Sequence, residues 1–63
     1  MVEFEIHKTI FQKLEKDSLT PEEIIRTIEM IIYLYHVNYY SLAFAIMLIQ
    51  KFLQKNKEIV IEK

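Results

Sequence analysis

The sequence predicts an all-α fold in which two helices, residues 21–36 and 41–56, form a hairpin and a shorter helix precedes them. Apolar residues recur at three- and four-residue spacings in both ranges, as on the buried face of a helix. A helix start signal stands at Thr20. Acidic residues prevail in residues 1–29 and lysines in residues 51–63, so an antiparallel hairpin would bring opposite charges together.

The N-terminal segment fits two kinds of secondary structure. Apolar and polar residues alternate over residues 2–7, which is typical of a half-buried strand, but apolar residues also recur there at helical spacing. Thr9 and Gln12 can form a capping box, in which two side chains satisfy free backbone N–H groups. We therefore expect a helix over residues 8–16 and leave residues 2–7 open, with a strand at residues 2–6 as one alternative.

The first helix of the hairpin has the clearest start signal. Thr20 is expected at the N-cap, Pro21 at the first helical position, and Glu23 as the carboxylate that completes a capping box. Leu19 before the cap and Ile24 inside the helix would pack together as a hydrophobic staple. These cues agree on a helix that begins at residue 21.

A turn is expected at residues 36–41, where polar residues interrupt the apolar spacing. Asn38 would adopt the left-handed conformation that ends many helices, and Asn38 or Ser41 would cap the second helix. Beyond that helix, residues 58–62 leave three alternatives open: pairing with residues 2–6, extension of the helix, or fraying.

The chain length of 63 residues predicts one small helical domain, residues 1–63, with a thin core. The chain has no Cys and two His, so neither a disulfide nor a zinc site is expected to stabilise it. Dense apolar packing and a partner subunit remain as sources of stability. The composition fits both, because 52% of the residues are hydrophobic.

Residues 30–50 carry no formal charge, and this stretch is long enough to raise the question of a membrane span. Its most polar residues lie at its centre, where a span would be most apolar, and no signal-peptide pattern precedes it. We therefore expect a turn in this stretch, no membrane partner, and a cytoplasmic protein.

The residues on both sides of the expected turn are apolar around the whole helix rather than along one stripe. One hairpin cannot bury such a surface, and large exposed apolar patches are rare in monomers. We therefore expect a two-fold homodimer with a helical-bundle core. The tyrosines near the turn add to this surface, because tyrosine is enriched at interfaces. The expected dimer or partner interface consists of Ile31, Tyr33, Leu34, Tyr35, Tyr39, Tyr40, Phe44, Met47 and Leu48.

Catalytic and cofactor chemistry has few candidate residues. The absence of Gly excludes P-loop and Rossmann nucleotide-binding motifs, and there is one Asp and no Cys for a catalytic triad. Glu29, Tyr33 and His36 share a helical face, but a helix-end role for His36 is the simpler interpretation. Glu3 and His7 would supply only two metal ligands. We expect no enzyme, no cofactor and no metal site.

A second hypothesis comes from the first half of the chain, where a strand followed by two helices resembles the ribbon-helix-helix DNA-binding dimers in order and size. The corresponding elements would be residues 2–6, 9–16 and 20–32. The resemblance implies paired N-terminal strands that read the major groove through Glu3, Glu5 and His7. Two carboxylates at reading positions and a net charge of −1 differ from the basic and amide side chains that usually contact DNA.

The sequence therefore predicts a non-catalytic, homodimeric helical-bundle protein that acts as a protein–protein interaction or adaptor module. Its expected partners are a second copy of itself and another protein, not nucleic acid. The alternative is a ribbon-helix-helix type transcriptional regulator, in which the residues from Leu42 onward form a C-terminal helical extension.

Overall fold

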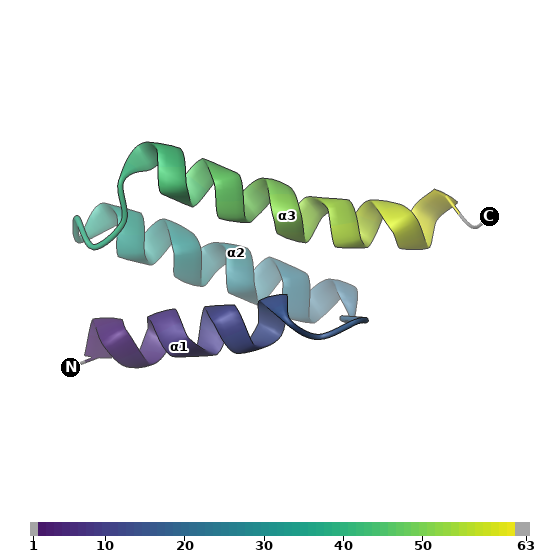
Figure 1. The fold of residues 1–63 in the computed structure, drawn as a ribbon, viewed down its shortest axis with the longest axis horizontal. Helices are drawn as coiled ribbons and strands as arrows, with labels where there is room; N and C mark the ends of the chain where they lie inside the picture. Colours follow the sequence, from purple (N-terminus) through teal and green to yellow (C-terminus); the bar gives the residue numbers. More distant parts are fainter. Residues whose placement is uncertain (1, 62–63) are drawn as a thin grey trace.

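Three helices make up the described part of the chain: α1 (Val2–Leu14), α2 (Pro21–His36) and α3 (Leu42–Ile61). In this computed structural model the backbone is described for residues 2–61 and the side chains for residues 2–55. Figure 1 shows the helices side by side, and α2 packs against both α1 and α3. No strand occurs among residues 2–61, so the all-α prediction is confirmed.

Helix α1 begins at Val2, six residues earlier than the helix expected over residues 8–16. The strand alternative for residues 2–6 is therefore wrong. Ile6 and Ile10 stand four residues apart, so a helix places both on one face, and Ile10 is fully buried in the core. Thr9 lies inside the helix, where its hydroxyl donates to the backbone oxygen of Glu5 at 3.0 Å, so the capping box proposed for Thr9 is also wrong.

Helix α2 starts as its sequence predicts. The Thr20 hydroxyl accepts a hydrogen bond from the Glu23 backbone N–H at 3.1 Å, and a Glu23 carboxylate oxygen accepts one from the Thr20 N–H at 3.0 Å. This reciprocal pair is the capping box, and Pro21 occupies the first turn. Leu19 and Ile24 are both buried, as the hydrophobic staple requires.

The Glu23 carboxylate also binds two lysines, but these come from the end of α1 and the loop after it. Lys13 Nζ lies 2.9 Å from Glu23 Oε2, and Lys16 Nζ lies 3.5 Å from the same atom. The charge pattern of the sequence predicts that this end of α2 lies beside the lysines of the last helix. Instead, Lys55 donates from α3 to the backbone oxygen of Lys16 at 2.9 Å. The hydrogen bond from Thr20 N–H and the contact with Lys13 lower the pKa of Glu23 to about 2.

Replacing Glu23 with Gln is expected to lower stability at pH 7 and to reduce the loss of stability in acid. The folded pKa of about 2 lies below the ordinary 4.5, so the carboxylate's contribution is complete above pH 4.5 and disappears as the pH falls toward 2. Thermal unfolding, followed by circular dichroism across this range, should show a shallower acid dependence for Glu23→Gln than for wild type. Glu22→Gln, in the same helical turn, is the control and should keep the wild-type slope. Identical slopes for wild type and Glu23→Gln would contradict the assignment.

The segment between α2 and α3 depends on Asn38. This residue has a φ of 65°, the left-handed conformation that the sequence predicts for it. The reversal lets the N–H groups of Tyr39 and Tyr40 donate to the backbone oxygen of Leu34, at 2.9 and 3.2 Å. Ser41 then caps α3, because its hydroxyl accepts from the Phe44 N–H at 3.2 Å.

Helix α3 continues to Ile61, beyond the predicted end at residue 56. Of the three alternatives for residues 58–62, helix extension is therefore the one observed for residues 58–61, and Glu62 lies outside the described residues.

The core lies between the three helices and is almost entirely apolar. Thr27 is its one buried polar residue among those whose side chains are described, and its hydroxyl donates to the backbone oxygen of Glu23 at 2.7 Å. This bond satisfies the hydroxyl within its own helix, so the core holds no polar group without a partner in the described part of the chain. The buried apolar residues are Ile10, Leu19, Ile24, Ile31, Leu34, Tyr40, Ala45, Leu48 and Phe52.

Candidate functional site

Four of the residues expected at an interface lie in the core of the single chain instead. Ile31, Leu34 and Leu48 are fully buried, and Tyr40 is nearly so. Each faces the other helices of its own chain, because all four belong to the one hydrophobic cluster. In this fold they have no side-chain surface left to offer a partner.

Two further expected interface residues, Tyr33 and Met47, are exposed on the sides of α2 and α3 that border α1. Tyr33 lines an open pocket between α1 and α2 together with Ile6. Met47 shares a helical face with Lys51, which lies four residues later and borders Leu14 of α1.

Phe44 is half-buried on the side of α3 that borders α1, where its ring lies 6.3 Å from that of Phe11 in α1. Tyr39 is exposed in the segment before α3.

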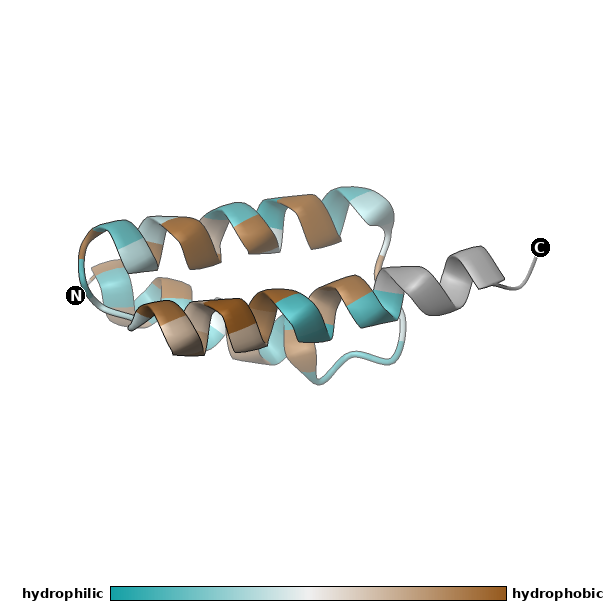
Figure 2. Cartoon of the chain, turned by 90° about the horizontal axis from the view of Figure 1, so that it is seen from above, coloured by the Kyte–Doolittle hydropathy of each residue, from teal (hydrophilic) through white to brown (hydrophobic). Residues whose placement is uncertain are grey.

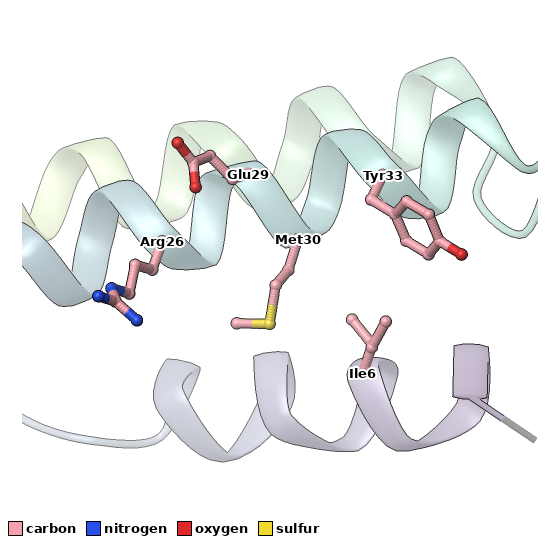
Figure 3. A pocket seen from close by; sticks show the side chains of 5 residues that line it. All are labelled: Ile6, Arg26, Glu29, Met30 and Tyr33. Atoms are coloured by element: carbon pink, nitrogen blue, oxygen red, sulfur yellow. The ribbon is translucent and has the colours of Figure 1, made fainter.

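Figure 3 shows the pocket between α1 and α2 from close by. Ile6 of α1 and Met30 of α2 point toward each other, and Glu29 points away from α1. The two charged residues of the lining, Arg26 and Glu29, do not converge on a shared point in this view. The pocket therefore has an apolar base without an arrangement of polar groups that would select a ligand.

Another exposed apolar surface lies on the side of α2 and α3 that faces away from α1. On α2, Ile25 and Ile32 are exposed seven residues apart, so they share a face, which is not the one that Met30 and Tyr33 turn toward α1. On α3, Leu42, Ile46 and Leu53 repeat this spacing. We call this surface the outer face. Its members are Ile25, Ile28, Ile32 and Tyr35 of α2 and Leu42, Ile46, Ile49 and Leu53 of α3.

The outer face is continuous because α2 and α3 are packed together. Figure 2 shows the two ribbons running past each other with hydrophobic residues along both. Ile28 and Ile49 are partly buried against the core, and the remaining six members are exposed. Its eight members carry no formal charge, and Ile25, at one end of the face, borders Glu22, Arg26 and Glu29. An uncovered apolar surface of this extent is typical of an interaction site.

The sequence identified only Tyr35 among the exposed members of this face. A signal for the others is present, since 25, 28, 32 and 35 and then 42, 46, 49 and 53 alternate steps of three and four. This spacing indicates a second row of apolar residues on each helix, beside the row that is buried in the core. Which row turns inward depends on where α1 packs, and the sequence alone does not give that position.

A second cluster of functional side chains surrounds His7, which the sequence considered as a metal ligand with Glu3. His7 Nδ1 lies 2.8 Å from the hydroxyl of Tyr40, and the two form a hydrogen bond. The ring of Phe11 lies 4.7 Å from that of His7, and the ring of Tyr39 lies at 5.9 Å. Burial raises the pKa of Tyr40 to about 12, with a smaller effect from Tyr39. This aromatic cluster joins α1 to the segment before α3.

Replacing Tyr40 with Phe is expected to lower the free energy of unfolding by about 1 kcal/mol, because His7 loses its hydrogen-bond partner. The raised pKa of about 12, against an ordinary 10.0, means that the phenol's contribution is complete below pH 10 and is lost as the pH rises toward 12. Spectrophotometric titration of the tyrosines should lose its latest-ionising component in Tyr40→Phe. Tyr39→Phe is the control and should retain that component; its loss there instead would refute the assignment to Tyr40.

Within residues 2–55, no three His, Asp or Glu side chains come together so as to hold a metal ion. Across residues 2–61, no helix has the length and apolar character that a membrane crossing needs.

No protein-family model, curated protein or solved structure matches the chain.

Proposed function

We propose that this protein is a non-catalytic protein–protein interaction module that works as a homodimeric helical bundle in the cytoplasm. The outer face is the observation that carries the proposal. Six large apolar side chains are exposed there, on two helices that are packed together. Their burial in an interface would yield roughly 25 cal/mol for each Å² removed from water.

The small size of the chain supports association. A domain of 63 residues buries a modest fraction of its surface, and small domains without disulfides or metals often gain stability from a partner subunit. The chain has no Cys, so a disulfide cannot supply that stability.

A non-catalytic role agrees with the use of the two residues whose pKa values are strongly shifted. Glu23 is held by the capping box and two lysines, and Tyr40 is bonded to His7 in the aromatic cluster. The pKa of Glu23 is lowered by contacts that stabilise the fold and that of Tyr40 is raised by its burial, and neither group lines a pocket among those described.

The DNA-binding alternative does not keep its main element. Ribbon-helix-helix proteins read DNA through paired N-terminal strands, whereas residues 2–6 belong to α1. Helix α1 therefore carries Glu3, Glu5 and His7, and His7 is hydrogen-bonded to Tyr40. We do not propose a DNA-binding role.

Sedimentation velocity of the purified chain without detergent tests the proposal. The expected mass at micromolar concentration is twice the chain mass of 7.7 kDa. A folded monomer that persists up to millimolar concentration would rule out the homodimer. Full circular-dichroism helicity in the same sample shows that the species measured is folded.

A further inference from the structure

We infer that two copies pair through the outer face, so that α2 and α3 of both chains form a four-helix core with each α1 on the outside. The inference rests on the proposed homodimer and specifies its surface. It places the interface away from the pocket between α1 and α2, which stays accessible, and of the tyrosines near the turn it includes Tyr35.

The area of the outer face is the first argument for a second copy. Its six exposed side chains are roughly half accessible, and large side chains of this kind offer on the order of 100 Å² each in that state. Two such faces would bury roughly 1,200 Å² in total, which reaches the lower end of the range for stable, specific interfaces. The outer face thus reaches the size of a small specific interface when its six exposed side chains are completely buried.

The spacing of the outer face is the second argument. Steps of three and four residues are those of helices that interlock in bundles and coiled coils, and both α2 and α3 show them on this face. Two helices per chain, each with such a stripe, complete a four-helix core when two chains meet.

The absence of charge on the outer face is the third argument. A two-fold interface brings the same patch of both chains together, so a charged patch would meet its own sign. The outer face holds apolar and tyrosine side chains only, and two copies can therefore meet without repulsion. A charged partner protein would find complementary groups only at the Ile25 end, beside Glu22, Arg26 and Glu29.

The chain offers two matched pairs of variants for the test, because neighbouring residues with similar exposure lie on different faces. On α2, Ile32 is 45% exposed on the outer face, and Tyr33 is 44% exposed on the side of α1. On α3, Ile46 is 46% exposed on the outer face, and Met47 is 40% exposed on the other side. A Glu at any of these four positions enters an already exposed site, so the fold of the single chain should tolerate it.

Sedimentation equilibrium on the four Glu variants tests the inference. Ile32→Glu and Ile46→Glu should raise the dimer dissociation constant at least tenfold, whereas Tyr33→Glu and Met47→Glu should change it less than threefold. Circular dichroism at the same concentrations reports whether the dissociated chains stay helical. Dissociation by the Tyr33 and Met47 variants, with Ile32 and Ile46 variants still dimeric, would overturn the inference and leave the proposed homodimer standing. A monomeric wild type would overturn both.

A second measurement does not require the dimer to be broken. Because the chain has no Cys, Ile46→Cys and Met47→Cys each introduce a single thiol. Alkylation of the thiol at position 46 by iodoacetamide should slow at least fivefold as the protein concentration passes the dissociation constant, and that at position 47 should not. Equal rates at both positions in a sample shown to be dimeric would place the interface elsewhere.

Discussion

Replacing Leu34 with Glu is expected to unfold the chain rather than only to separate two copies. Leu34 is fully buried between the helices, and its backbone oxygen accepts hydrogen bonds from the N–H groups of Tyr39 and Tyr40 after α2. A carboxylate at this position would have no cationic partner, and an unpaired buried charge costs about 3–5 kcal/mol. A domain of this size has a total stability on the order of 3–9 kcal/mol, so most of it would be lost.

Urea denaturation, followed by circular dichroism, measures this effect, and Tyr33→Glu is the matched control. Tyr33 precedes Leu34 but is exposed, so a Glu there should change the free energy of unfolding by less than about 0.5 kcal/mol. The size of the difference checks the assignment of Leu34 to the core of the single chain. A Leu34→Glu protein with wild-type stability would show that the side chain faces solvent.

Replacing Phe52 with Ala is expected to have the second largest effect, a loss of about 3–5 kcal/mol. Phe52 is among the largest fully buried side chains of the described part of the chain, so its removal leaves a cavity that three short helices can close only in part. The core of a chain this small has few other residues to compensate.

Leu53→Ala provides the control for this cavity. Leu53 follows Phe52 on α3, yet it lies on the outer face and is about half exposed. Its truncation should leave the unfolding of the isolated chain nearly unchanged and weaken the pairing of two copies. Chemical denaturation at two protein concentrations separates these effects, because dimer stability depends on concentration. Equal losses for both variants at low concentration would contradict the burial assigned to Phe52.

The sequence could predict the structural features that depend on neighbouring residues. The start of α2 at Thr20, the left-handed Asn38 and the capping of α3 by Ser41 each require only side chains within a few positions. These features are confirmed because the same local hydrogen bonds form whatever the distant parts of the chain do.

The start of α1 could not be predicted, because the apolar residues of residues 2–7 fit both the alternation of a strand and the spacing of a helix. The helical face that contains Ile6 and Ile10 favours a helix over a strand only when α2 supplies a surface that buries it. Four of the expected interface residues were mispredicted for the same reason, because distant packing decides which apolar residues are buried. Leu34 and Ile32 are both apolar and two residues apart, and only the packing of α1 and α3 decides that the first turns inward and the second outward.

The order in which the helices pack has a consequence for the speed of folding. Helix α2 packs on α1 before it in the chain and on α3 after it, so most contacts join segments that are close in sequence. Chains with this property close short loops and collapse in microseconds to milliseconds. The bond between His7 and Tyr40 spans 33 residues, so its ring contacts are expected to form late, after each pair of helices has assembled.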